Sequence, residues 1–200
     1  MAGREISDEP DLFLTTLAPT SGQRRSTVAA VVALLILLGL AAPFAAVQLP
    51  RSPAFVTFQQ GILCVSDLIT AAMLFSQFSF IRSRTLLVLA SGYLFTALIV
   101  IPHTLTFPGA FTPTGLLGAG RQSTAWLYIF WHLGFPLSLL AYAWLKDDRS
   151  KKYVTQVSTL SAICRSAAIV IVLVFALTLL ATVAEEFLPR ILDDDGRLTS

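Results

Sequence analysis

The stretch AFVTFQQGILCVSDLITAAMLFSQFSF, residues Ala54–Phe80, is long and apolar enough to cross a bilayer, and it carries one acid, Asp67, near its middle. A membrane-spanning helix needs about 20 mostly apolar residues. At mid-membrane an ionisable side chain costs roughly 2.5–3.5 kcal/mol on insertion scales, so such a residue is a functional-site hypothesis by default. The stretch therefore predicts an integral membrane protein and makes Asp67 its first candidate site residue.

The composition indicates the same class of protein. Apolar residues make up 55% of the 200 residues and charged residues 13%, against roughly 25% charged residues in soluble domains. Five segments reach the length of a spanning helix: Ser26–Val47, Ala54–Phe80, Thr85–Ile101, Ser123–Leu145 and Ala167–Phe187. The predicted fold class is an all-α integral membrane protein, a bundle of about five transmembrane helices.

Lys and Arg are distributed unevenly among the segments that connect these spans. Bacterial inner-membrane proteins concentrate them on the cytoplasmic side. With the N-terminus inside, ten of the 14 lie on that side: Arg4, Arg24, Arg25, Arg82, Arg84, Lys146, Arg149, Lys151, Lys152 and Arg165. The outside holds Arg51, Arg121, Arg190 and Arg197. We expect a multi-pass protein of the bacterial inner membrane with a cytoplasmic N-terminus. Because the basic residues follow the membrane edges, no nucleic-acid partner is expected.

These spans divide the chain into three parts. Residues 1–25 are expected to form a disordered cytoplasmic tail, residues 26–188 the membrane-embedded domain, and residues 189–200 an extracytoplasmic tail, interrupted before further helices. Cys64 and Cys164 lie in or next to spans at different depths, so no disulfide is expected.

The connection Pro102–Gln122 differs from the other loops. It holds four of the eleven glycines and three of the ten prolines, yet it also holds apolar side chains such as Phe107 and Phe111. Long apolar loops usually act as lids or binding loops. We predict an ordered extracytoplasmic cap folded over the outer ends of the second and fourth spans; a plug that binds nothing is the alternative. Its candidate residues are Phe107, Pro108, Gly109, Gly118, Gly120 and Arg121.

Polar residues gather on one side of two predicted helices when residues are projected at 100° each. In the second span Gln60 and Asp67 lie beside a stripe that includes Gln77. In the fourth span Tyr128 and His132 share a face, and Pro136 follows where a kink would free backbone carbonyls. The residues that could sense a ligand or a proton are Asp67, His132, Gln60, Gln77, Tyr128 and His103.

We predict that Asp67, His132, Gln60 and Tyr128 form one buried polar cluster, because His132 is the ionisable side chain closest in depth to Asp67. Asp67 as a structural anchor between helices is the alternative. The cofactor is unknown. Haem is not expected, because the two histidines lie at different depths, and the sequence contains no HExxH zinc motif, phosphate loop or paired nucleophile and base. The chain itself is therefore expected not to be an enzyme.

Several blocks in order resemble one family. They are Asp67–Phe78, Ala90–Phe95, His103, Phe107–Gly109, Gly115–Gly120 with Gln122, and Trp126–Pro136. Together they resemble the bacterial membrane-associated sensor domains of the MASE series, fourth type, from roughly Val28 to the C-terminus. The resemblance implies an input domain for a cytoplasmic diguanylate cyclase or histidine kinase, which this chain lacks.

Two functions remain open at this point. In the first, the bundle passes a ligand, lipid, redox or proton signal to such an output domain. The expected partners are then the lipid bilayer, an unidentified small ligand and a second copy of the protein joined through the output domain. In the second, the chain is a small membrane redox or transport protein that uses Asp67 and His132 directly.

Overall fold

The computed structural model describes residues 20–45, 47, 52–147 and 158–191. Five helices within them are long and apolar enough to cross a membrane. Their bounds are Ser21–Ala41 (α1), Pro53–Ile81 (α2), Arg84–Thr106 (α3), Arg121–Asp147 (α4) and Thr159–Thr182 (α5), with short 3-10 turns Ala42–Phe44 (η1) and Glu185–Phe187 (η3). These helices confirm the predicted fold class. Most of the predicted tails, residues 1–19 and 192–200, lies outside the described residues.

The chain divides into two compact units, Met1–Arg51 and Ser52–Ser200. The first unit contains α1, which begins inside the segment predicted as a tail. Thr20 caps it: the Thr20 hydroxyl accepts from the backbone N–H of Gln23, and the Gln23 side chain returns a bond to the Thr20 N–H. None of the residues of α1 is buried. Pro43 lies in the 3-10 turn that ends this helix, short of the predicted boundary at Val47.

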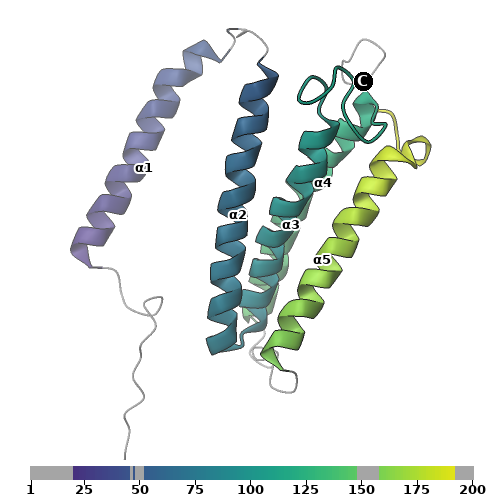
Figure 1. Cartoon of the computed structure of the whole chain (residues 1–200). Helices are drawn as coiled ribbons and strands as arrows, with labels where there is room; N and C mark the ends of the chain where they lie inside the picture. The colour runs from purple at the N-terminus through teal and green to yellow at the C-terminus, as the bar shows by residue number, and fades with distance from the viewer. Residues whose placement is uncertain (1–19, 46, 48–51, 148–157, 192–200) are drawn as a thin grey trace, which may run out of the picture. The chain divides into compact units, whose positions relative to one another are not determined.

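In the second unit, α3 is the central helix. It packs against α2, α4 and α5, and Figure 1 shows it standing between α2 and α5. In the most hydrophobic 18-residue stretch of α3, 44% of the residues are buried, whereas the corresponding share in the other spans is 11% or less. The core contains Phe95 and Ile99 of α3, Leu127 of α4 and Val170 of α5. The other helices therefore each turn one side to α3 and leave most of their surface to lipid.

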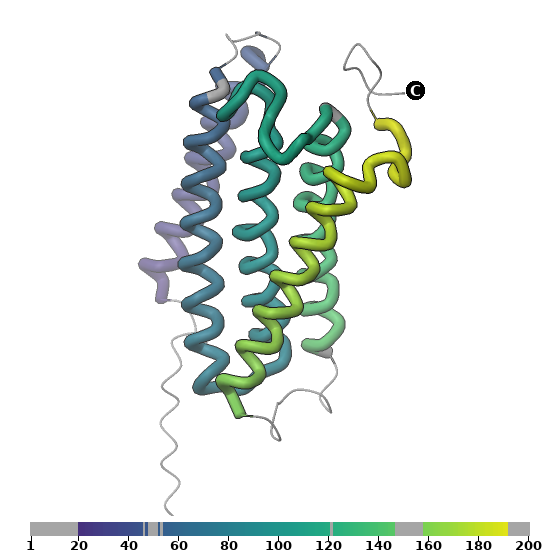
Figure 2. Tube along the Cα trace, turned by 45° about the vertical axis from the view of Figure 1, so that its right-hand side comes forward, coloured from purple at the N-terminus to yellow at the C-terminus, as the bar shows by residue number. Residues whose placement is uncertain are grey.

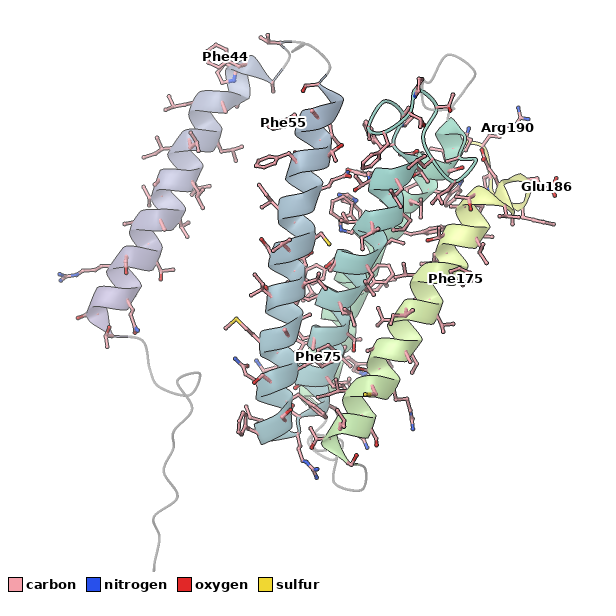
Figure 3. The ribbon with its side chains drawn as sticks, in the orientation of Figure 1. Phe44, Phe55, Phe75, Phe175, Glu186 and Arg190 are labelled. Carbon is pink, nitrogen blue, oxygen red and sulfur yellow. The ribbon has the colours of Figure 1, made fainter. Side chains whose placement is uncertain are left out.

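Helix α2 packs on α3 through the face that carries two of the predicted polar residues, Gln60 and Asp67, whereas the rest of the polar stripe is exposed or half-buried. Gln60, Ala71 and Phe78 are buried and Asp67 is half-buried, and these positions recur at helical spacing on one face. On the other face, Phe55 and Phe58 are 65% and 68% exposed. Figure 3 shows Phe55 extending from α2 on the side away from α3.

Helices α3 and α4 approach each other closely at two glycines. A Cβ added at Gly92 would lie 2.2 Å from Ser138 Oγ, and one added at Gly134 would lie 2.1 Å from the ring of Phe95. Small residues four apart, such as Gly134 and Ser138, allow backbones in membranes to come together. The contact between α3 and α4 therefore depends on the absence of these two side chains.

Helix α5 begins earlier than the predicted start at Ala167. Ser158 accepts a bond from the backbone N–H of Ser161, so the helix starts at Thr159 and includes Arg165. Arg82, in the left-handed conformation with φ 53° after α2, donates two bonds to the Thr159 hydroxyl at 3.0 and 2.8 Å. The turn between α2 and α3 is thereby fastened to the start of α5, which then runs obliquely across α3 and α4 (Figure 2).

The loop after α3 is ordered and shorter than predicted, because α3 continues through Pro102 to Thr106. Leu116 N–H donates to the Leu105 carbonyl at 2.8 Å, and the Thr124 hydroxyl of α4 donates to the Thr106 carbonyl at 2.9 Å. Gly115 has φ +87°, and a Cβ there would lie 2.3 Å from the Thr106 oxygen. The loop therefore folds back on the end of α3.

The prediction for the cap residues is correct only in part. Phe107 is half-buried and contacts the His103 ring, with centroids 6.2 Å apart. Pro108, Gly109, Gly118 and Gly120 are exposed, and of these Gly120 contacts α4, because its N–H donates to the Ser123 hydroxyl at 3.1 Å. Hydrogen bonds pin the loop to α3 and α4. Arg121 is the first residue of α4, and its side chain lies outside what the structure describes.

Alanine at either contact glycine is expected to destabilise the bundle. Gly92→Ala and Gly134→Ala each place a methyl group inside a neighbouring side chain, and overpacking of this kind costs about 1–3 kcal/mol. Gly61→Ala on α2 is the matched control, since a Cβ there meets no atom within 4 Å. Unfolding in mixed detergent, followed by circular dichroism, measures the differences; equal stability of all three variants would contradict the close contact.

Candidate functional site

Asp67 of α2 is hydrogen-bonded to Thr96 of α3. The Thr96 hydroxyl lies 2.8 Å from Asp67 Oδ2 and 2.9 Å from the carbonyl oxygen of Tyr93, one turn earlier. A hydroxyl has a single proton to donate. The carboxyl group and the Tyr93 carbonyl therefore compete for one proton, and a well-aligned bond to either weakens the bond to the other.

This arrangement can satisfy Asp67 in either protonation state. An ionised carboxylate accepts the Thr96 proton. A neutral carboxyl group donates its own proton to the Thr96 oxygen, and the Thr96 proton then goes to the Tyr93 carbonyl. The three groups can thus exchange one hydrogen-bond pattern for another without moving apart.

A pocket of about 330 Å³ opens beside this pair of residues. It lies between α2, α3 and α4 and holds one carboxyl group, that of Asp67, and one imidazole, that of His132. The other lining residues are Tyr93, Thr96, Trp131, Phe135 and Pro136. The Tyr93 and Phe135 rings meet edge to face, with centroids 5.0 Å apart. The volume is sufficient for several water molecules or for a small solute.

His132 is held in one orientation at this pocket. Its Nδ1 lies 2.9 Å from the Tyr128 carbonyl oxygen, and its ring stacks on the Tyr128 ring with centroids 3.8 Å apart. A carbonyl only accepts, so Nδ1 carries the proton and Nε2 of the neutral ring keeps its lone pair. Pro136 has no N–H and cannot bond the carbonyl of His132, which leaves a further acceptor on this part of α4.

A second polar centre lies nearer the loop. Gln60 Nε2 of α2 lies 2.9 Å from His103 Nδ1 of α3, and both residues are buried. The Thr104 hydroxyl donates to Gln60 Oε1. His103 thus lies inside the bundle at the end of α3, not in a loop at the mouth as the sequence predicted.

Aromatic rings connect the two centres. The Trp131 ring is 5.7 Å from the His103 ring and 4.6 Å from the His132 ring, centroid to centroid. The Tyr128 ring likewise lies 6.1 Å from His103. The Tyr128 and Trp131 rings therefore each contact both histidine rings.

The six predicted sensing residues fall into three groups. Asp67 and His132 line one pocket, and Tyr128 stacks on His132. Gln60 pairs with His103, so the single cluster that joined Gln60 to Asp67 is wrong, and His132 is exposed at the bundle surface rather than buried. Gln77 is half-buried on α2, about 15 Å along the helix from Asp67, and lines no part of this pocket.

Sequence reasoning missed Thr96, the partner of Asp67. A signal for it exists, because Gly92, Thr96 and His103 fall within about 40° of one another on α3 when residues are projected at 100° each. All three are buried. A projection of the third span would therefore have revealed the face that meets α2 and α4.

The arrangement offers proton donors and acceptors rather than a metal cage. Among the residues that the structure describes, no three His, Cys, Asp or Glu side chains are placed to hold a metal ion. The fold and the pocket define a multi-pass integral membrane protein with a polar site between three of its helices.

The model of one family, the membrane-associated sensor integral membrane domain MASE4, matches residues 50–198. The chain therefore belongs to the MASE4 family of membrane sensor domains. The match includes α2 to α5. Helix α1 precedes it, so the matched region starts later in the chain than Val28, where the resemblance was expected to begin. The chain has no significant match among curated proteins or among solved structures.

Loss of the Thr96 hydroxyl is expected to weaken the contact between α2 and α3. Thr96→Val leaves the Asp67 carboxyl group without this donor, and hydrogen bonds between helices in membranes contribute about 0.6 kcal/mol on average and up to roughly 1.7. Thr70→Val is the control, because the Thr70 hydroxyl bonds only the Ser66 carbonyl of its own helix. Steric-trapping measurements in bicelles compare the variants; equal losses for both would contradict the role of Thr96.

Proposed function

We propose that this chain is the sensory input domain of a bacterial signalling protein and that the Asp67 pocket is its sensing element. The observation that carries the proposal is the shared Thr96 hydroxyl, which can serve Asp67 or the Tyr93 carbonyl. A change in the charge of Asp67, or a small polar ligand that enters the pocket, alters which of the two bonds forms. The signal is thus read as a change in the hydrogen-bond pattern that joins α2 to α3.

Such a change is suited to control an output domain. A sensor works when two packings of a bundle differ by only a few kcal/mol and the signal favours one of them. Membership of a membrane sensor family supports this role. The output that we propose is a cytoplasmic diguanylate cyclase or histidine kinase, which acts as a dimer.

Asp67→Asn is expected to remove the response. The amide resembles the neutral carboxyl group in shape but cannot ionise, so the complete protein encoded by the gene should be held in one signalling state. Coupling between sites in proteins typically amounts to about 5- to 150-fold. We therefore expect basal cyclic-di-GMP synthesis or autophosphorylation to change by about 5-fold or more and to lose its dependence on external pH or ligand.

Leu68→Met is the matched control, because Leu68 is the next residue on α2 and is 39% exposed. It should leave the output unchanged, whereas His132→Ala should shift it as Asp67→Asn does. Wild-type signalling by both polar variants would overturn the proposal and leave Asp67 as an anchor between helices.

We further propose that the chain lies in the inner membrane with its N-terminus in the cytoplasm. The bias of ten basic residues against four supports this orientation. It places the Phe107–Gly120 loop outside and the connection between α4 and α5 inside.

Cysteine labelling tests this orientation. In a background without Cys64 and Cys164, a membrane-impermeant maleimide added to spheroplasts should label Thr114→Cys, because Thr114 is exposed in the loop. Ser150→Cys, between α4 and α5, should react only after the membrane is broken. Labelling of Ser150→Cys alone in intact spheroplasts would reverse the orientation.

A further inference from the structure

Helices α3, α4 and α5 enclose a groove of about 590 Å³ on the side of the α3–α4 pair away from the Asp67 pocket. Adjacent residues mark the two sides: Phe95 and Gly134 line the groove, whereas Thr96 and Phe135 line the pocket. The other residues that line the groove are mainly apolar, among them Leu133, Leu137, Val170 and Leu173.

The polar atoms in the groove are already satisfied. Ser91, Ser138 and Ser166 line it, and each donates its hydroxyl proton to a carbonyl of its own helix, at 2.7, 2.7 and 3.1 Å. The groove therefore presents a hydrocarbon surface, which favours an apolar occupant over a polar one.

One end of this groove is basic. A second hollow of about 530 Å³ is lined by Arg84 and Arg165 and shares Leu87, Val88, Ser166 and Ile169 with the groove, so the two are continuous. Both arginine side chains are exposed, and neither has an acidic partner among the residues that the structure describes. Helices α3 and α5 both begin here, and their N-terminal dipoles add positive potential.

The dimensions match one leaflet of a bilayer. Along α5 the apolar groove runs from Ser166 to Leu177, about 16 Å at 1.5 Å per residue. Half of a hydrocarbon core of about 30 Å is about 15 Å. An acyl chain that begins at the level of the arginines therefore ends near the far end of the groove.

We propose that this groove binds an acyl chain of an anionic glycerophospholipid, with the lipid phosphate held between Arg84 and Arg165. The arginines meet the charge of the head group, and the groove covers the hydrocarbon. This lipid site is separate from the Asp67 pocket, and the proposal does not rest on a sensing role of that pocket.

Photo-crosslinking from inside the groove tests the proposal. The full chain, with benzoylphenylalanine in place of Leu173, is reconstituted in nanodiscs of phosphatidylcholine and phosphatidylglycerol, and the crosslinked lipid is identified by mass spectrometry. Leu173 lines the groove; Ile171, two residues away and 56% exposed, does not and serves as the control position. We expect phosphatidylglycerol at Leu173 in excess of the bulk ratio by roughly fivefold for each arginine engaged, and the bulk ratio at Ile171.

Charge variants identify the head-group site. Arg84→Gln with Arg165→Gln should reduce the excess at Leu173 to the bulk ratio, while the matched double change Arg24→Gln with Arg25→Gln in α1 should preserve it. Arg84→Lys with Arg165→Lys keeps the charge and should retain most of the excess. Bulk lipid at Leu173 in the wild type, crosslinks to a second copy of the protein, or an excess that survives the double Gln change would each overturn the proposal.

Discussion

The hydrocarbon core of a bilayer supplies no water, so every polar group within it needs a partner from the protein. This constraint explains why α3 is the central helix. Thr96 and His103, both on α3, meet the polar side chains of α2, Asp67 and Gln60. The same helix carries Gly92, which lets α4 come close enough to complete the pocket. Most of the remaining surface of α2, α4 and α5 is apolar and faces outward, where it meets lipid.

Length and hydropathy predicted the five spans, because both depend only on local sequence. The ends of the spans were less predictable. The fifth span was predicted to begin after Arg165, because a charged residue usually lies outside the hydrocarbon core. The long arginine side chain can instead extend its charge toward the surface, and α5 begins well before it, after its cap Ser158. Pro102 suggested another boundary, yet α3 continues for a further turn. Both errors arise where a residue that usually marks the end of a membrane span is tolerated within the helix.

The polar site was predictable in its parts but not in its pairing. Projection of the second and fourth spans indicates that Asp67 and His132 face the bundle, and they do line one pocket. Which residues bond each other depends on the relative height of helices. Gln60 lies two turns from Asp67, at the level of His103, so it pairs there. The relative heights of the helices depend on contacts between them, such as that of Gly134 with the Phe95 ring. The sequence of one span alone does not reveal such contacts.

Phe95 and Thr96 are consecutive residues of α3 that face opposite hollows, the apolar groove and the Asp67 pocket. A wall one helix thick separates the two. An occupant of the groove that shifts the α3 backbone at Phe95 also shifts Thr96, and so changes the geometry offered to Asp67. Linkage is reciprocal: whatever factor a groove occupant applies to the affinity of the pocket, an occupant of the pocket applies in return. On the roles proposed for the two hollows, the lipid composition of the membrane therefore alters the response of the Asp67 pocket.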